Sequence, residues 1–373
     1  MLLMASAGFG LSQIAKSFPN NAAWQFVGTQ TDHTPWAGCT LWDVIQPAFM
    51  FMVGVAVPWS VANRQARGDS FGSMLGHALW RSLLLVLLAV FLTSAWSKQT
   101  DWIFTNVLAQ IGLGYFFLFL LAFTRTRTIW LTGFGILLVS WLAFALHPLP
   151  PPGFDWKSVG VPENWPRLTG FAAHWEKNAN FAATFDLWFL NLFPRSKPFT
   201  FNAGGYQTLN FVPALATMIF GLLAGRLLRS ELPRRMQLQR LVLAGFAGIA
   251  LGLVLGLSGL CPIVKRIWTP SWTLFSSGLV ALILAGFVTL VDGRGRQRWA
   301  FSLVVVGLNP ITLYCLWQLS GSFIRQQVQT HFGQSIFASF GETWVPAMER
   351  GIVLFVLWLI VFWMYRRKIF LRI

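Results

Sequence analysis

The chain has 373 residues, of which 55% are hydrophobic and 11% are charged. A soluble domain carries roughly 25% charged residues, so this composition excludes an ordinary soluble protein and predicts a polytopic membrane protein of the all-α class. The formal net charge of +16 does not indicate a nucleic-acid partner, because the basic residues fall in short clusters between apolar runs and not on one soluble face. The lipid bilayer is the first partner that the sequence predicts.

Apolar runs long enough to cross a hydrocarbon core of roughly 30 Å recur along the chain. The first, residues 1–14, is short and lacks the basic start and cleavage pattern of a removable signal peptide, so we expect the chain to begin inside a helix. With this run, the sequence predicts about ten transmembrane helices forming a single domain, residues 1–373, with both termini cytoplasmic. The other runs lie at about residues 41–62, 82–97, 102–124, 129–146, 208–228, 241–260, 272–291, 299–319 and 351–365.

The basic residues predict the orientation of these helices, because cytoplasmic loops carry an excess of Lys and Arg. Most of the 28 basic residues lie in short connections on one side, which we assign to the cytoplasm. The longer segments then lie on the non-cytoplasmic side. The basic residues of the short connections are Arg64, Arg67, Arg81, Arg125, Arg127, Arg226, Arg229, Arg234, Arg235, Arg240, Arg294, Arg296, Arg298, Arg366, Arg367, Lys368 and Arg372.

Two of the longer segments have a pattern of their own. Residues 147–207 begin with a cluster of prolines and are rich in tryptophan, which is too aromatic for a disordered linker, so we expect a folded extramembrane lid. In residues 320–350 an apolar residue recurs at every fourth position from Ile324 to Phe340, which places these side chains on one helical face. That spacing predicts an amphipathic helix lying on the bundle or in the membrane interface.

In the stretch 32–60, a histidine and a carboxylate lie close to the N-terminal end of a predicted apolar helix. Imidazole is the side chain whose ordinary pKa allows proton transfer near neutral pH, which makes His33 a candidate catalytic residue. Asp43 has two interpretations. It can complete a capping box with Thr40, or it can accept the N–H of the imidazole and fix the tautomer that takes a proton.

Other polar residues stand out against apolar surroundings and are candidates for substrate or cofactor binding. Lys265 and Arg266 lie beside Trp268, and cations next to aromatic rings can bind phosphate, carboxylate or a sugar face; an interface anchor is the alternative. Asn309 precedes Pro310, where its side chain can replace a hydrogen bond lost at a kink or can face a cavity. Polar residues inside membrane helices normally point into the bundle. Three more candidates are isolated polar or amphipathic side chains: Trp36, Asn106 and Gln110.

Motifs for other chemistries do not occur in the sequence. It contains no GxxxxGK[ST], HExxH or CxxC pattern, and the five histidines have no ligand spacing. We therefore expect no metal cofactor.

Four motifs resemble a known family, the membrane acetyltransferases typified by heparan-alpha-glucosaminide N-acetyltransferase and their bacterial relatives of the DUF5009 type. The first motif consists of His33, Trp36, Gly38, Thr40, Asp43, Pro47 and the run Phe49 to Gly54. The second consists of Asn106, Val107, Leu108, Gly112, Tyr115 and Phe116, the third of Pro262, Lys265, Trp268 and Ser271, and the fourth of Gly307, Leu308, Asn309 and Pro310. The likeness covers nearly the whole chain.

The resemblance implies an enzyme that moves an acetyl group from cytoplasmic acetyl-CoA to a sugar amine or hydroxyl on the non-cytoplasmic side. It further implies that His33 is the catalytic residue, that Asp43 is its partner, that the acceptor is an amino sugar or glycan, and that the chain resides in the bacterial inner membrane. An acyl-histidine route and direct transfer both remain open, as do the acceptor and the oligomeric state, a homodimer included. A transporter or flippase for a sugar or lipid-linked substrate is the alternative function.

The sequence also departs from the family pattern in three places. Met1 lies beyond the charged Asp-x-x-Arg-Gly that usually precedes the first helix, Gln110 stands where the family often has arginine, and Asn202 to Gly205 replaces an acidic Asp-Pro-Glu-Gly. These departures bear on the substrate that the chain accepts.

Overall fold

A computed structural model describes residues 1–293 and 298–371, in which all regular secondary structure is helical. Of the arginines assigned to the cytoplasmic side, Arg294, Arg296 and Arg372 lie outside the described residues. Contacts divide the chain into two compact units. The first unit comprises Met1–Thr34, Thr40–Ile45 and Phe287–Ile373, and the second comprises Pro35–Cys39 and Gln46–Gly286.

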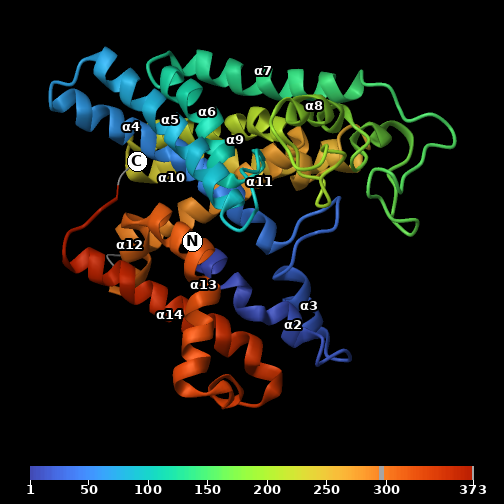
Figure 1. Ribbon diagram of the computed structural model, residues 1–373. Helices are drawn as coiled ribbons and strands as arrows, with labels where there is room; N and C mark the ends of the chain where they lie inside the picture. Colours follow the sequence, from blue (N-terminus) through green and yellow to red (C-terminus); the bar gives the residue numbers. More distant parts are fainter. Residues whose placement is uncertain (294–297, 372–373) are drawn as a thin grey trace. The chain divides into compact units, whose positions relative to one another are not determined.

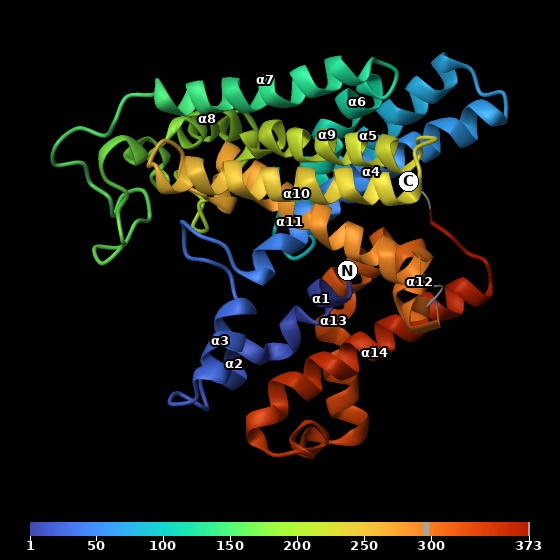
Figure 2. The same cartoon turned by 180° about the vertical axis from the view of Figure 1, so that it is seen from behind.

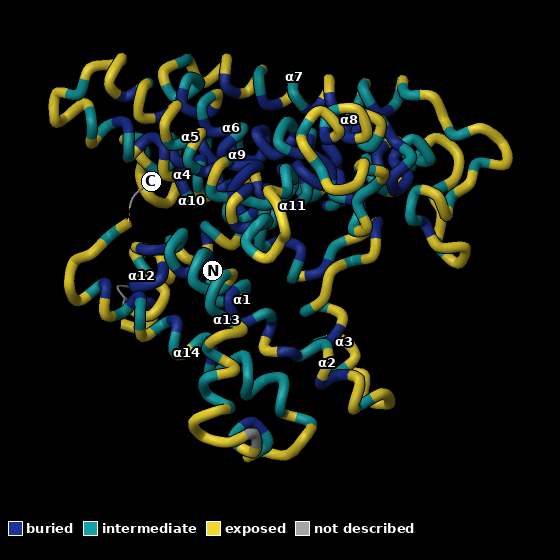
Figure 3. The backbone as a smooth tube through the Cα atoms, viewed as in Figure 1, coloured by how far each residue is buried: buried dark blue, intermediate teal, exposed yellow. Residues whose placement is uncertain are grey.

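The second unit is built around α9, Phe211–Leu228, in which eleven of 18 residues are buried. Figures 1 and 2 show α7, Thr126–Ala145, and α10, Arg234–Leu257, running beside α9, and Figure 3 shows exposed turns along the outer face of α7. The remaining helices of this unit are α4 Ile45–Ala66, α5 Phe71–Ser94, α6 Val107–Leu121, α8 Phe181–Phe189 and α11 Pro270–Phe287.

Glycines allow α4 and α9 to touch along their backbones. A Cβ atom on Gly54 would overlap the carbonyl oxygen of Met218, and a Cβ on Gly221 would overlap that of Phe51. Small residues at a crossing are the usual means by which membrane helices approach closely, since lipid gives no hydrophobic drive for helix association. This contact fixes α4, the helix that follows the His33 loop in the chain, against the most buried helix of the second unit.

The first unit contains the two ends of the chain. Here α2, Leu11–Ala15, packs on α3, Ala22–Gln30, and α13, Pro310–Phe332, packs on α14, Val345–Arg366. The short helices α1, Leu2–Ala5, and α12, Phe301–Leu308, complete the unit.

Within the part of the chain that the structure describes, seven helices are long and apolar enough to cross a membrane, and an eighth is formed if one bent pair counts as a span. These seven correspond to seven of the ten predicted runs. The run 102–124 forms only the 15-residue α6, and the run 299–319 falls on α12 and α13, which meet at a bend of 72°. The chain is thus a helical membrane protein, and the predicted number of about ten spans is not confirmed among the described residues.

Two expectations for single helices differ from the structure, in both cases at glycines. Residues 1–14 form short pieces, because the four consecutive residues from Ala7 to Gly10 adopt positive φ angles, of 62° at Gly8 and 67° at Gly10. In residues 320–350 the helix ends at Phe332, since Gly333 has a φ of 85°, and two 3-10 turns, Gln334–Ala338 and Glu342–Trp344, separate it from α14. The fourfold apolar repeat therefore continues past the end of the helix that it predicts.

The segment between α7 and α9 is folded. It contains 3-10 turns at Gly170–Trp175 and Leu190–Leu192 around α8, and a further turn at Thr208–Asn210 leads into α9. Its core is aromatic: Trp175 is fully buried and stacks on Phe144 of α7. The aromatic content that distinguishes this segment from a linker thus becomes its packing core.

Candidate active site

His33 and Asp43 form a hydrogen-bonded pair in the first unit. The His33 Nδ1 and Asp43 Oδ1 atoms are 2.7 Å apart. The imidazole is 37% exposed, whereas the carboxylate side chain is 2% exposed. A buried acid thus contacts one nitrogen of a ring whose remaining surface reaches the outside of the unit.

The other carboxylate oxygen of Asp43 holds the backbone in place. Asp43 Oδ2 accepts hydrogen bonds from the backbone amides of Thr34, at 3.1 Å, and Thr40, at 3.3 Å, and it lies 3.0 Å from the Thr40 hydroxyl. Thr40 and Asp43 form the predicted capping box at the start of a 3-10 turn, Leu41–Val44, that leads into α4. The contacts expected of both interpretations of Asp43 are therefore present: Oδ1 contacts the imidazole, and Oδ2 completes the capping box.

Further contacts orient the loop that carries the histidine. The His33 backbone amide donates to Asp32 Oδ1 at 2.7 Å, and Gln30 Oε1 accepts the amide of Leu41 at 3.0 Å. The Trp42 ring lies edge-on to the imidazole, with 6.4 Å between ring centroids. The carboxylate, the aromatic edge and the capped turn together limit the orientations open to the imidazole.

Trp36 lies in the second unit and is buried. Its indole N–H donates to the carbonyl oxygen of Trp175 at 3.1 Å, and its ring meets Trp165 edge-on. A Cβ on Gly205 would crowd the same ring. These contacts make Trp36 a packing anchor for the segment between α7 and α9.

Lys265, Arg266 and Trp268 lie in and directly after a 3-10 turn of the second unit, Lys265–Ile267. Arg266 donates to the carbonyl oxygen of Gly204 at 2.7 Å. Lys265 is 6% exposed, and Trp268 is 1% exposed with its N–H donating to Thr217 at 3.1 Å. The turn thus tethers α9, through Thr217, to the Gly204 loop.

Gln110 and Asn106 belong to α6 in different ways. Asn106 is the N-cap of the helix and accepts the amide of Leu108 at 2.9 Å. Gln110 is 1% exposed and donates to the carbonyl oxygens of Phe104 and Thr208, while its Oε1 has no hydrogen-bond partner among the described residues. Gln110 therefore joins α6 to the turn that precedes α9.

Asn309 lies at the bend between α12 and α13 and is fully buried. Its amide group donates to the carbonyl oxygen of Ile369 and accepts the N–H of Leu371, both at 3.1 Å. The side chain therefore connects the bend, where Pro310 interrupts the helix, to the backbone of residues 369–371.

A group of buried polar residues around the turn Thr208–Asn210 was not among the predicted site residues. Asp186 of α8 is fully buried and accepts the amide of Thr208 at 2.9 Å. Burial raises the pKa of Asp186 to about 6. Burial also lowers the pKa of Lys177, as does the nearby Arg266, and its ammonium lies over the Trp165 ring. Asp186 had one visible signal in the sequence: it is the only acid in the apolar stretch 181–193.

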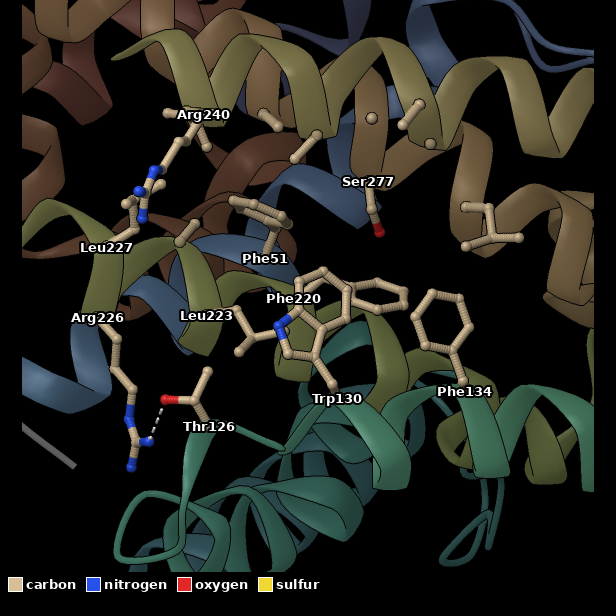
Figure 4. A pocket seen from close by; sticks show the side chains of 18 of the residues that line it. Phe51, Thr126, Trp130, Phe134, Phe220, Leu223, Arg226, Leu227, Arg240 and Ser277 are labelled. Carbon is tan, nitrogen blue, oxygen red and sulfur yellow. Dashed lines mark hydrogen bonds between the residues drawn. The ribbon is translucent and has the colours of Figure 1, made fainter. Parts of the chain in front are cut away.

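A cavity of about 550 Å³ lies in the second unit between α7, α9, α10 and α11. Figure 4 shows Arg226 and Arg240 at one end of it and the rings of Trp130 and Phe134 along a wall. Ser277 is 6% exposed, and its hydroxyl, which points into the cavity, has no hydrogen-bond partner among the described residues. The cavity is thus basic at one end and apolar along its length, with one buried hydroxyl.

Comparison with characterised proteins connects this geometry with an enzyme. The chain is similar to heparan-alpha-glucosaminide N-acetyltransferase. It is 23% identical to the Homo sapiens protein and 24% identical to the Mus musculus protein, in each case over 91% of this chain. No protein-family model matches the chain.

The similarity to the two N-acetyltransferases supports the family resemblance seen in the motifs. The chain covers 55% of the human protein and 56% of the mouse protein, so it spans about half the length of the relatives it matches. Among the described residues, no group of three or more His, Cys, Asp or Glu side chains is arranged to hold a metal ion.

Proposed function

We propose that this integral membrane protein is an acetyltransferase that transfers an acetyl group from acetyl-CoA to the amine or hydroxyl of a sugar, with His33 as the catalytic base. The observation that carries the proposal is the 2.7 Å hydrogen bond between His33 and the buried Asp43. Similarity to two N-acetyltransferases along 91% of the chain supports it. The same relatives give no support to a transporter or flippase.

The His33–Asp43 pair supplies an oriented base. When Nδ1 of His33 donates to Asp43, the lone pair that can accept a proton is on Nε2. The carboxylate also stabilises the imidazolium that forms when this nitrogen takes a proton. Because Asp43 Oδ2 is occupied by the amides of Thr34 and Thr40, the carboxylate cannot easily rotate away from the ring.

The chemistry requires a base because an amine or hydroxyl must lose a proton as it attacks a thioester. The new bond joins the acceptor nitrogen or oxygen to the acetyl carbon, and the bond from that carbon to the thiol sulfur breaks. His33 takes the proton from the acceptor and returns it to the departing thiolate, so no proton is gained or lost overall. A positioned general base typically accelerates such a step by about 10² to 10⁴.

The cavity of the second unit supports coenzyme A as the donor, because it combines a basic end with apolar walls. Arg226 and Arg240 would face the phosphate groups, because guanidinium groups bind phosphate oxygens in pairs. The unpartnered hydroxyl of Ser277 would donate to an amide of the pantetheine chain, and Trp130 would pack on that chain. When bound, the coenzyme supplies an acetyl carbon activated as a thioester.

The proposal includes a direction of transfer and a location. The clusters of arginine at the short connections support a cytoplasmic side for the donor, and the acceptor would then be met on the opposite side, in the inner membrane of a bacterium. The chain would function there as a one-domain enzyme with its long segments outside the cytoplasm.

Replacement of the histidine tests this function. Membrane vesicles containing the chain should transfer label from acetyl-CoA to glucosamine, and His33→Ala should lower kcat by about 10² to 10⁴, because the base is lost. Asp43→Asn should lower kcat by a similar factor with little change in KM, since the amide would favour the wrong tautomer.

A matched control separates this chemistry from folding. Gln30→Ala removes the cap on Leu41 but leaves the pair intact, so it should cost about 1 kcal/mol of stability and keep its activity. Undiminished transfer by His33→Ala would overturn the proposal, and uptake of the sugar without acetylation would indicate a transporter.

A further inference from the structure

A second cavity, of about 340 Å³, lies within the folded segment between α7 and α9. Its walls come from the proline-rich turn after α7, from the start of α8 and from residues 199–202. Three phenylalanine side chains line it together with the amides of Asn178 and Gln207. This mixture of apolar walls and a few polar groups is typical of small-molecule sites.

Gln207 has an acceptor that the protein does not use. The side chain is 1% exposed, and its Nε2 contacts Asn178 Oδ1 at 3.4 Å. Its Oε1 is buried and has no hydrogen-bond partner among the described residues. A buried acceptor left unpaired destabilises the fold, so a ligand that donates a hydrogen bond to this oxygen would remove that penalty.

Asn178 holds this polar wall rigid. Its backbone has a φ of 54°, a left-handed conformation that asparagine tolerates better than most residues. Its side-chain amide donates to the carbonyl oxygens of Val159 and Asn202, both at 2.9 Å. Two loops are therefore joined through one side chain, and the position of Gln207 against it is set before any ligand binds.

The charges around the cavity select a neutral ligand. Among the described residues that line it, His147 is the only ionisable one. Burial lowers the pKa of His147, as does the nearby His174, and both effects favour the neutral ring. Since no carboxylate lines the cavity, nothing there would compensate the charge of an ammonium group.

We propose that this cavity binds a neutral sugar ring of the acceptor glycan. Hydroxyl groups of the sugar donate to Gln207 Oε1, and the apolar face of the ring packs on Phe154 and Phe199. This inference rests on the proposed function and adds a subsite to it, which holds the glycan through a sugar that does not itself react.

Binding without the donor tests the subsite independently of catalysis. Titration calorimetry of the detergent-solubilised full chain with N,N′-diacetylchitobiose should show saturable binding, and Gln207→Leu should weaken it about tenfold, as the loss of one hydrogen bond predicts. Phe154→Ala, which removes one of the aromatic rings that line the cavity, should also weaken binding. Lys197→Gln, an exposed change in the same segment that does not line the cavity, should leave binding unchanged.

The outcomes separate the two proposals. If His33→Ala abolishes acetyl transfer but still binds the disaccharide with wild-type affinity, both the subsite and its separation from the catalytic base are supported. Binding by a chain that shows no transfer would support the subsite and overturn only the proposed function. Absence of saturable binding to the wild-type chain, or equal affinities of Gln207→Leu, Phe154→Ala and the wild type, would overturn the subsite.

Discussion

Asp186 shows how one buried carboxylate ties the folded segment to α9. Its Oδ2 accepts the amide of Thr208, while its Oδ1 is buried with no hydrogen-bond partner among the described residues. Burial raises the pKa from 3.8 to about 6. Between these values the folded chain keeps a proton that the unfolded chain releases, so the group stabilises the fold fully below about pH 4 and loses that contribution as the pH rises to about 6.

The variant Asp186→Asn should remove this pH dependence. Asparagine can still accept the Thr208 amide but carries no charge, so the variant should gain stability relative to the wild type as the pH rises from 4 to 7, by up to about 3 kcal/mol. Thermal unfolding in detergent, measured for both chains at several pH values, checks this. A difference in Tm that stays constant over the range would contradict the assigned cause.

At the scale of residues, the contact between His33 and Asp43 could be predicted from the sequence because the loop with His33 leads directly into the turn with Asp43, ten positions later. Local spacing and the capping box carry that information. Gln207 and Asp186 could not be assigned in the same way, because their environments come from Asn178 and Thr208, each more than 20 positions away. A side chain that is buried by segments distant in the sequence cannot be recognised from the local spacing of apolar residues.

The crossing of α4 and α9 is the element-scale feature most sensitive to side-chain size. Gly54 and Gly221 each leave room for a backbone carbonyl of the other helix, and a Cβ on Gly225 would overlap that of Val55. Such positions cannot accommodate a larger side chain without moving one helix away from the other. Three glycines at one crossing therefore define how closely these helices approach.

A pair of identical substitutions tests this crossing. Gly221→Leu should lower the Tm in detergent and the yield of folded protein, because the new side chain would overlap Phe51. Gly135→Leu, on α7 where a Cβ would meet nothing within 4 Å, should leave both close to wild type. Similar losses in the two variants would show that helix propensity is responsible, and not the close contact.

Helix positions followed well from the sequence, whereas helix ends did not. Of the about ten spans predicted from apolar length, seven coincide with helices long and apolar enough to cross a membrane, because hydropathy measures compatibility with the bilayer directly. The fourfold repeat from Ile324 to Phe340 failed as a helix predictor because Gly333 turns the chain in the middle of it. A glycine that adopts a positive φ can end a helix even where the apolar spacing continues. The reason is that the backbone at that residue no longer has the helical geometry needed for the next i to i−4 hydrogen bond.

At the scale of the whole molecule, the described helices agree with the division between short and long connections. The short ones, 67–70, 122–125 and 229–233, join α4 to α5, α6 to α7 and α9 to α10. Arginine lies in or beside each of them. Because positive charge is retained on the cytoplasmic side, these three connections are expected to share that side.

Cysteine labelling in right-side-out vesicles tests this arrangement. In a background without Cys39, Cys261 and Cys315, Lys197→Cys should react with a membrane-impermeant maleimide, whereas Arg235→Cys should react only after the vesicles are opened. Both positions are exposed in the structure, so access depends on the side of the membrane. The reverse pattern would invert the orientation and with it the proposed direction of transfer.

The side-chain amide of Asn309 connects the bend between α12 and α13 to a segment far away in the sequence. Its two hydrogen bonds reach the backbones of Ile369 and Leu371, only a few positions from the last residue of the sequence. A truncation after Lys368 would remove both hydrogen-bond partners of the Asn309 side chain, which is fully buried at the 72° bend. Residues 369–371 are therefore part of the structure of the helix break, and a deletion or insertion among them would alter the bend as well as the segment that it changes.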